Sequence, residues 1–380
     1  MSARTEALAR LDSFIEKVPL YEKTRNYDRP GHEGVSRLSA WIRYRALTEE
    51  ECVRRVLQRH PLTLAEKFLQ EIMWRTYWKG WLEMRPGVWA RYTKEVTRLR
   101  EFHHHDSAYQ AACGGQTSLT FFNDWVRELT DTGYLHNHTR MWFASVWIFT
   151  LNLPWQLGAA FMYHHLLDGD AASNTLSWRW VGGLHTRGKI YVAKPDNIMT
   201  FSGGRWAPKK NELVLDPKPL PFDGEAEVRS LPSVSCAPVP DGALILMHDD
   251  DLTSDLSLEL AAKNCVYAIL GLPRVEQSVQ VGAHVASLRS DARERTAARA
   301  VKSADEIVAL ARELGVSSVY SMLPSIGFEH AALIEMADQL NTIGVPVIWH
   351  RRGWDTRHMP LARSGFFRFW QEAQQGLSSL

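Results

Sequence analysis

Three short segments concentrate polar and aromatic side chains whose types and order suggest ligand chemistry. Residues 132–141 read TGYLHNHTRM, residues 168–174 read DGDAASN, and residues 178–180 read WRW. Upstream, Ser36, Arg37 and Ser39 offer two hydroxyl groups and a cation. With backbone N–H groups, these are the donors that a pyrophosphate binds. The alternative for Ser36 and Ser39 is an ordinary role as helix caps.

Taken together, these segments resemble the flavin core of DNA photolyases and cryptochromes, whose pattern is TGxxHNxxRM, DGDxAxN and WxW. Residues 35–39, VSRLS, resemble the TSRLS phosphate loop of that family, and residues 71–75, EIMWR, resemble its E-hh-W-R helix. The resemblance covers about residues 8–180. It implies a mostly α FAD-binding domain of photolyase type, with FAD as cofactor.

The resemblance also implies a role for each matching residue. Arg140 and Asp168 match a salt bridge beside the isoalloxazine ring, and a buried charge must be paired. The alternative is that they form an ordinary ion pair. Asn174 matches the residue facing flavin N5, where an amide can donate or accept a hydrogen bond. Asp170 matches a position near the adenine end. The complete set implied to bind FAD is Tyr21, Ser36, Arg37, Leu38, Ser39, Phe68, Arg75, Arg140, Asp168, Asp170 and Asn174.

Photolyases that split cyclobutane pyrimidine dimers hold the flipped lesion in a pocket over the flavin. The residues that match this catalytic pocket are Glu71, Trp74, Asn137, His138, Met141 and Trp180. The two tryptophans would stack on the pyrimidine rings, while Glu71 and Asn137 would form hydrogen bonds with base edges. His138 departs from the pattern, because those enzymes have an arginine there. The (6-4)-type enzymes have a histidine pair at the Asn137 and Met141 positions. This chain lacks both histidines, so specificity for (6-4) lesions is disfavoured. The alternative is that the tryptophans and Met141 pack a core.

Photoreduction in the family uses a tryptophan relay, of which Trp178 matches the proximal member and Trp155 the middle one. The alternative is that both are core residues. The distal position falls near Phe102, which cannot easily pass a hole to water. Candidates to replace it are Trp142, Trp147 and Tyr134. The following histidines, 103–105, are predicted to form a solvated loop, and no metal site is predicted, because no neighbouring ligand spacing completes one.

Three further departures lie near the cofactor and the DNA-facing surface. Asn123 stands where the family has Asp, residues 176–177 replace a Gly-Gly, and residues 41–45, WIRYR, replace a Gly-containing loop. They weaken the expectation of nucleic-acid binding more than that of FAD binding.

The elements that must position these residues change type along the chain. Helical spacing predicts helices over 7–18, 64–84, 118–129 and 137–149, and Thr48 with Glu51 forms a capping box. Prolines crowd residues 205–241, which predicts an extended linker. Strands are then predicted over 243–247, 265–270, 316–321 and 345–349. They alternate with helices over 304–314 and 331–340, as in a parallel α/β domain.

We therefore predict a helical FAD-binding domain over 1–206, a Pro-rich linker over 207–241 and a small Rossmann-like α/β domain over 242–380. Residues 243–255, 313–320 and 366–370 resemble parts of the photolyase antenna domain, which normally precedes the FAD domain. This order implies a circular permutation. A tightly bound antenna chromophore is not expected, since the domain is short and acidic residues replace the Arg pair after its first strand.

Bulk properties narrow the setting. Residues 1–206 hold 27 basic and 21 acidic residues and the remainder 17 and 22, so a basic first half is compatible with a polyanionic partner. Four scattered cysteines and a charged N-terminus predict a cytoplasmic protein without disulfides or export signal. Residues 141–163 lack charge, but Asn152, Pro154 and Gln156 interrupt them, so two buried helices are favoured over a membrane span.

The leading functional hypothesis is a deoxyribodipyrimidine photo-lyase-like enzyme that repairs cyclobutane dimers in damaged DNA with light and reduced FAD. The alternative is a cryptochrome-like blue-light photoreceptor or a non-repair flavoprotein that uses the same FAD site. His138 and the altered loops favour the second hypothesis.

Overall fold

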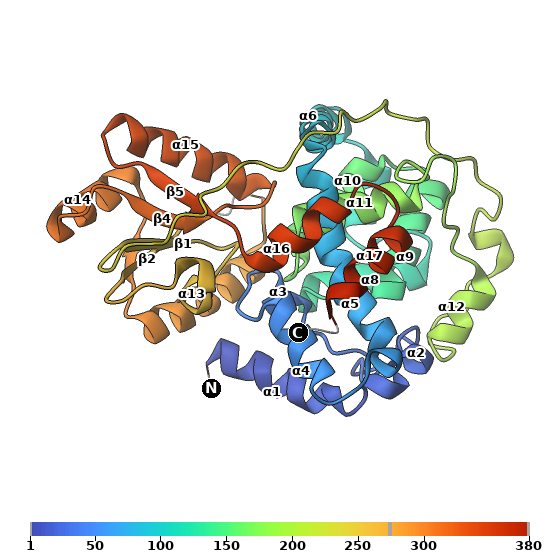
Figure 1. The fold of residues 1–380 in the computed structure, drawn as a ribbon. Coiled ribbons are helices and arrows are strands. Elements are labelled where there is room, and N and C mark those ends of the chain that lie inside the picture. The colour runs from blue at the N-terminus through green and yellow to red at the C-terminus, as the bar shows by residue number, and fades with distance from the viewer. Residues whose placement is uncertain (1, 273–275, 378–380) are drawn as a thin grey trace.

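The computed structural model describes residues 2–272 and 276–377, which form a helical body beside a small α/β unit (Figure 1). The α-helices of the body, in chain order, are α1 (Ala3–Ile15), α2 (Tyr21–Thr24), α3 (Ser39–Ile42), α4 (Glu49–Leu57), α5 (Leu62–Glu83), α6 (Pro86–His103), α7 (Ser107–Cys113), α8 (Thr120–Thr132), α9 (Asn137–Ser145), α10 (Trp155–His165), α11 (Ala171–Val181) and α12 (Pro195–Phe201). The predicted mostly helical first half is confirmed.

Helix α5 is the central element of the helical body. Most of its residues are buried, including the polar residues Gln70, Thr76, Lys79 and Glu83, because other helices surround it. The preceding helix α4 begins with the predicted capping box. The Thr48 hydroxyl accepts from the Glu51 N–H, and the Glu51 carboxylate accepts from the Thr48 N–H. This cap fixes where the chain turns into α4 and then α5.

Residues 137–165 form the two buried helices that the sequence predicts. Helix α9 continues through a π-helical turn, Val146–Thr150, and Asn152 then adopts a left-handed conformation with φ of 53°. Pro154 precedes α10 and ends the turn. In the described part of the chain, no helix has both the length and the apolar composition that crossing a membrane requires.

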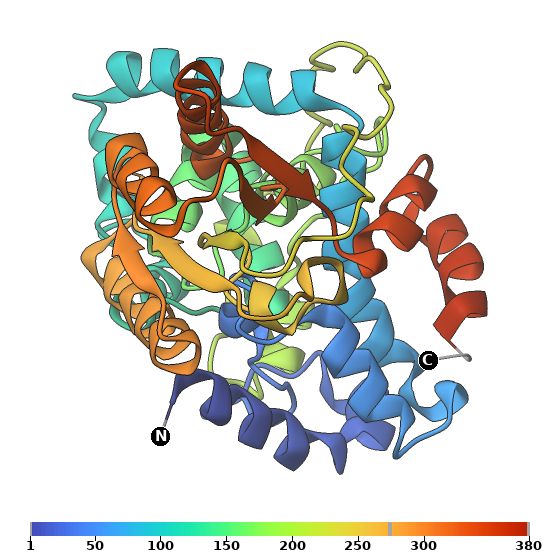
Figure 2. The ribbon, with the colours of Figure 1, turned by 60° about the vertical axis from the view of Figure 1, so that its left-hand side comes forward.

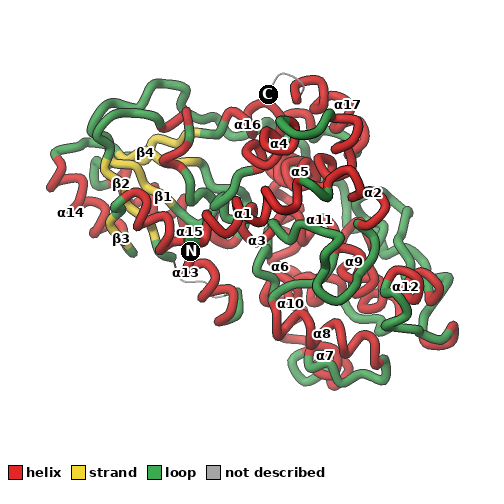
Figure 3. Tube along the Cα trace, turned by 90° about the horizontal axis from the view of Figure 1, so that it is seen from below, coloured by secondary structure: helices red, strands yellow, loops and turns green. Residues whose placement is uncertain are grey.

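The α/β unit contains one parallel sheet of five strands in the order β3-β2-β1-β4-β5, which confirms the predicted Rossmann-like class. The strands are β1 (Leu244–Met247), β2 (Val266–Leu270), β3 (Arg299–Val301), β4 (Val319–Met322) and β5 (Val347–His350). Helix α13 (Val279–Thr296) packs on one face, while α14 (Ala304–Leu314) and α15 (Phe328–Thr342) pack on the other. All the strands gather at one end of the molecule (Figure 3).

The sequence prediction misses α13 and β3. The buried face of α13 is narrow, with Val281, Val285 and Leu288 as its largest apolar residues. Strand β3 is a three-residue edge strand with two exposed positions, so it shows no alternation of apolar and polar residues.

The last two helices, α16 (Gly353–His358) and α17 (Phe366–Leu377), leave the sheet and pack along α5 (Figure 2). Trp354, Phe366 and Phe369 belong to the same apolar core as α1 and α5. The aromatic segment 366–370, predicted to close the α/β domain, therefore lies in the helical body instead. Local sequence does not show which of two cores an amphipathic helix joins.

The Pro-rich stretch is extended, as predicted, but it is fastened to both units. Arg229 N–H donates to the Met84 carbonyl at 2.8 Å, and Ser235 N–H donates to the Trp349 carbonyl at 2.8 Å. The domain boundaries proposed from sequence stay a prediction.

Candidate functional site

A cavity of about 440 Å³ opens in the helical body among α5, α9, α11 and the loop over residues 35–39. Its wall contains every residue that the sequence predicts to bind FAD, namely Tyr21, Ser36, Arg37, Leu38, Ser39, Phe68, Arg75, Arg140, Asp168, Asp170 and Asn174. Five separate segments of the chain supply them. The structure thus brings the predicted set together, while their role in binding stays a prediction.

The predicted ion pair between Arg140 and Asp168 is formed in the cavity wall. Arg140 Nη1 donates to Asp168 Oδ2 at 3.0 Å, and its Nε donates to the Leu135 carbonyl at 2.9 Å. Burial by itself raises the pKa of Asp168, but Arg140 and Arg75 outweigh it and hold the pKa below its ordinary value. The carboxylate is therefore ionised in the cavity.

The first turn of α11 places two more of these residues. Asp170 caps the helix by accepting from Ser173 N–H at 2.8 Å. One turn later, Asn174 Nδ2 donates to the Ala159 carbonyl of α10 at 2.8 Å. The amide can still offer Oδ1 as an acceptor and its second N–H as a donor to a ligand in the cavity.

Buried polar atoms without a partner surround the cavity. Among the described residues, Arg75 Nη1, Asp168 Oδ1, Ser173 Oγ and Trp178 Nε1 are buried and lack a hydrogen-bond partner, and all four side chains line the wall. Unsatisfied groups of this kind are costly unless a ligand or water completes them. The donor and acceptor set, with the hydroxyls of residues 36 and 39, fits FAD.

A charged cluster around His32 immediately precedes the candidate phosphate loop, residues 35–39. His32 lies between two carboxylates, with Nδ1 3.1 Å from Asp28 Oδ1 and Nε2 3.1 Å from Glu128 Oε1. Arg205 Nη2 also lies 3.1 Å from Asp28 Oδ1, and the Thr139 hydroxyl donates to the same carboxylate. The three carboxylate and imidazole groups are close enough to share a cation. The two carboxylates, however, are already balanced by His32 and Arg205.

We expect this cluster to make stability fall at alkaline pH. Burial by itself lowers the pKa of His32, but the Asp28 and Glu128 carboxylates, which accept hydrogen bonds from the imidazole and attract its positive charge, outweigh burial and raise that pKa to about 9. A folded-state pKa above the unfolded value adds stability below about pH 6.5, and that stability is lost as pH rises through 9. The free energy of unfolding of the wild type should drop by on the order of 2 kcal/mol between pH 6.5 and 9.5.

Chemical denaturation across this range measures the effect, with His32→Gln as the test variant. The variant should lose most of the slope. His104→Gln, an exposed histidine on the turn after α6, is the control and should keep it. Equal slopes in wild type and His32→Gln would exclude the cluster as the cause.

The rim of the cavity holds five of the six residues predicted to be catalytic. Glu71, Trp74, Asn137, Met141 and Trp180 all line it. Glu71 accepts from Arg25 Nη1 at 2.7 Å, and burial, which outweighs Arg25, raises the pKa of Glu71. Trp180, which lies in α11, stacks on Tyr191 with ring centroids 5.8 Å apart.

Two predicted residues do not reach the cavity. His138 turns the other way, with Nδ1 2.9 Å from the Asn26 carbonyl oxygen and its ring stacked on Trp142 at 4.8 Å. Its side chain therefore does not lie with the other five. Trp155 stacks on Tyr92 with centroids 5.6 Å apart, outside the wall that contains Trp178. Their neighbours in three dimensions, which no motif encodes, decide both orientations.

The cavity also contains residues that the motif comparison does not assign to it. Arg25, Trp78 and Tyr134 are in its wall. Trp78 lies one turn beyond Trp74 on α5, so i, i+4 spacing could have identified it. The Tyr134 ring lies under the guanidinium of Arg37 at 4.9 Å, a contact without a sequence signal.

The unusual loop over residues 41–45 makes the junction with the α/β unit. Arg43 is buried, donates from Nε to the Gly169 carbonyl at 2.8 Å and donates from Nη1 to Asp250 Oδ1 at 2.5 Å. Asp250 follows β1, so Arg43 fills the carboxyl edge of the sheet, where open α/β sheets commonly bind ligands. Asp250 also accepts from Ser325 N–H at 2.8 Å.

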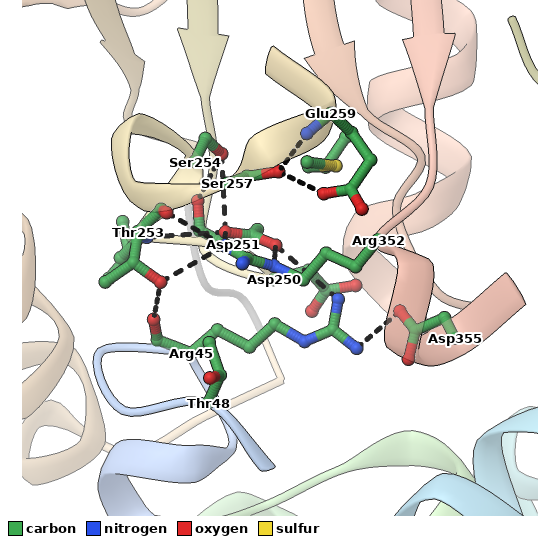
Figure 4. Close-up of polar contacts among 12 residues, drawn as sticks. Arg45, Thr48, Asp250, Asp251, Thr253, Ser254, Ser257, Glu259, Arg352 and Asp355 are labelled. Carbon is green, nitrogen blue, oxygen red and sulfur yellow. Dashed lines mark hydrogen bonds and ion pairs between the residues drawn. The ribbon is translucent and has the colours of Figure 1, made fainter. Parts of the chain in front are cut away.

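A second ion pair network lies beside it (Figure 4). Arg45 donates from Nη2 to Asp355 Oδ2 at 2.6 Å, while Arg352 donates from Nε to Asp251 Oδ2 at 2.6 Å. Burial by itself raises the pKa of Asp251, but Arg352 and Arg45 outweigh it and lower it to about 2. The departure from the family's glycine loop thus serves the contact between the two units.

Comparison with known proteins identifies the class of the helical body. Residues 68–203 match a protein-family model described as the FAD binding domain of DNA photolyase. Over these residues, the chain is similar to the FAD-binding domain of DNA photolyases, which confirms the predicted resemblance.

Curated relatives agree with this assignment. The chain is 31% identical over 173 residues to a deoxyribodipyrimidine photo-lyase of Salmonella typhimurium, covering 43% of this chain and 36% of the relative. It is 33% identical over 179 residues to the enzyme of the same name from Thermus thermophilus, covering 47% and 42%. The chain therefore spans less than half the length of these relatives.

Solved structures give partial alignments. A cryptochrome of Synechocystis sp. aligns at 22% identity with a TM-score of 0.46, covering 52% of this chain and 43% of that one. A class III photolyase of Agrobacterium tumefaciens aligns at 25% identity with a TM-score of 0.44, covering 53% and 42%.

Proposed function

We propose that this protein is a light-driven, FAD-dependent DNA lyase that splits cyclobutane pyrimidine dimers. The observation that carries the proposal is that Glu71, Trp74, Asn137, Met141 and Trp180 share one cavity with the eleven candidate FAD ligands. When bound and reduced, FAD supplies the light-excited electron for ring splitting. Damaged DNA is the partner, and a flipped lesion is the substrate.

The residues of the chain supply binding, orientation and charge. Arg140 and Asp168 fix a charged pair against the cofactor, and Asn174 Oδ1 presents an acceptor to it. Residues 36–39 hold the pyrophosphate through hydroxyls and backbone N–H groups. At the rim, Trp74 and Trp180 offer ring faces or edges to the bases, while Glu71 and Asn137 bind base edges.

Repair is tested with photoreduced protein, an oligonucleotide that contains one thymine dimer, and blue light. We expect loss of the dimer in light only, measured by chromatography of the digested DNA. Glu71→Gln should lower the rate at least about tenfold, since it removes a charged acceptor at the base edges. Glu22→Gln, an exposed glutamate on neighbouring helix α2, should leave the rate unchanged. A wild type that binds flavin but leaves the dimer intact would overturn the proposal.

The electron route to the surface runs through Trp147 and ends at Tyr109. Trp178 in the cavity wall contacts Trp147 with centroids 6.3 Å apart, and Trp147 contacts Tyr109 at 6.0 Å. Gly158 makes room for this packing, because a Cβ there would clash with Trp178 and lie 2.8 Å from Trp147 Nε1. Tyr109 is half-buried and lines a surface hollow, so it can exchange charge with water.

Replacing Tyr109 by phenylalanine should therefore slow photoreduction of bound flavin about tenfold or more. The rate is followed by absorbance under blue light with an external reductant. Tyr92→Phe, which alters the ring stacked on Trp155, is the matched control. If Tyr92→Phe slows photoreduction and Tyr109→Phe does not, the route runs through Trp155 instead.

The protein works without an antenna chromophore in this proposal, because Arg43 occupies the sheet edge beside Asp250. A second candidate function is a blue-light photoreceptor with the same cavity. It is favoured by the commitment of Arg43 and Arg45 to the junction, which removes two cations from the surface available to DNA. Binding of a protein partner that changes with illumination, without repair, would support this alternative.

A further inference from the structure

The indole of Trp74 is positioned by other aromatic rings. Phe366 of α17 stacks on it face to face, with centroids 3.7 Å apart and planes inclined by 8°. Tyr77 contacts it edge-on at 5.5 Å. Within the described residues, the indole N–H of Trp74 forms no hydrogen bond with the protein, so stacking is what sets the plane of this cavity-lining ring.

Phe366 is itself immobilised by α16 and α17, which are fastened along α5. Trp354 Nε1 donates to Thr76 Oγ1 at 3.0 Å, and Tyr77 Oη donates to the Ser364 carbonyl at 2.8 Å. A Cβ at Gly80 would lie 2.7 Å from the Met359 carbonyl oxygen, so glycine permits the close approach of this segment. Helices α16 and α17 are therefore held firmly against α5.

We infer that Phe366 is a positioning residue for the substrate pocket, and that α17 supports that pocket through Trp74 although it lies beyond the α/β unit in sequence. The inference rests on the proposed function. Phe366 is 4% exposed and does not line the cavity, so it acts through Trp74. By covering one indole face, it leaves only the remaining surface of Trp74 for contact with a base.

The test compares Phe366→Ala, Phe366→Leu, Phe366→Tyr and Phe367→Ala. Phe367 is the matched control, because it is the adjacent residue on α17 but is 73% exposed. The readouts are the Kd for a dimer-containing oligonucleotide in the dark and the repair rate at saturating DNA. Because the stacked pair of Phe366 and Trp74 holds the indole in place, we expect Phe366→Ala and Phe366→Leu to weaken DNA binding about three- to tenfold. Phe366→Tyr, which retains the ring, should return to within about twofold of wild type.

Leucine fills the core without a ring face, so Phe366→Leu separates stacking from loss of stability. A Phe366→Leu protein that binds DNA as wild type does, or a Phe367→Ala protein with an equal loss, would overturn the inference.

A second readout needs no DNA and keeps the two proposals distinguishable. In protein labelled with 5-fluorotryptophan, the ¹⁹F resonance of Trp74 is assigned by its absence in Trp74→Phe. We expect this resonance to shift in Phe366→Leu and to stay in Phe367→Ala. A shift in a protein whose wild type repairs nothing would retain the positioning role and reject the lyase. An unshifted resonance in a protein that repairs DNA would do the opposite.

Discussion

Replacing Arg43 by methionine will destabilise the protein by about 3–5 kcal/mol, because it leaves the Asp250 carboxylate buried beside an apolar group. Arg43 is fully enclosed and contacts both the helical body, through Gly169, and the sheet, through Asp250. Burial by itself raises the pKa of Asp250, but Arg43 and Lys79 outweigh it and lower that pKa. Without Arg43, Lys79 and the Ser325 N–H compensate only part of the cost of burying this charge.

Thermal unfolding followed by circular dichroism measures the loss, which we expect to lower the Tm by roughly 10 °C. Arg299→Met is the control, since Arg299 pairs with Glu313 on the surface with both side chains more than half exposed. It should change stability by less than about 1 kcal/mol. Adding Asp250→Asn to Arg43→Met should recover part of the loss, because the buried charge is gone. Equal Tm values for Arg43→Met and Arg299→Met would show that the junction does not depend on the pair of Arg43 and Asp250.

Replacing Arg140 by methionine will lower the affinity for FAD by a factor of about 100 or more, equivalent to roughly 3 kcal/mol. Arg140 supplies the main charge opposite Asp168 in the cavity wall, and its Nε also ties the side chain to the backbone at Leu135. Asp168 Oδ1 has no hydrogen-bond partner in the wild type, and the substitution also removes the Arg140 donor from Oδ2. Cofactor binding would then occur next to a carboxylate that has lost its hydrogen-bonded cation.

The flavin content of purified protein, from the ratio of absorbance at visible and ultraviolet wavelengths, gives the first measure, and titration of the apoprotein with FAD gives the Kd. Arg98→Met provides the control, because Arg98 forms an exposed pair with Glu95 far from the cavity wall. The circular dichroism of both variants must match that of wild type. Unchanged flavin content in Arg140→Met would show that the cavity does not use this ion pair to bind FAD.

Much of the candidate site could be predicted from sequence because α5 and α11 encode it locally. Glu71, Trp74 and Arg75 fall on one side of α5 by i, i+3 and i+4 spacing, so a helix prediction already groups them. Asp170 and Asn174 are likewise four residues apart at the start of α11. The resemblance to the photolyase pattern then relates these helices to each other and implies that residues from separate segments share a single cavity.

The orientation of single side chains could not be predicted in the same way. His138 belongs to the same motif as Asn137 and Met141, yet it turns toward Trp142 and Asn26. Which of Trp142, Trp147 and Tyr134 could replace the distal relay member also depends on which rings meet in space, and Trp147 contacts Trp178. Such contacts join residues far apart in the chain, where periodicity carries no information.

Local periodicity and turn chemistry in the sequence predict the helical and α/β halves, the cap of α4 and the extended linker, while the resemblance to the photolyase pattern predicts which residues share the cavity. Only the tertiary structure decided that α17 returns to α5, that Phe366 covers Trp74, and that Arg43 reaches Asp250 across the junction. These contacts arise from burying apolar faces and pairing buried charges between distant segments, and many segments of suitable polarity could satisfy the same local pattern.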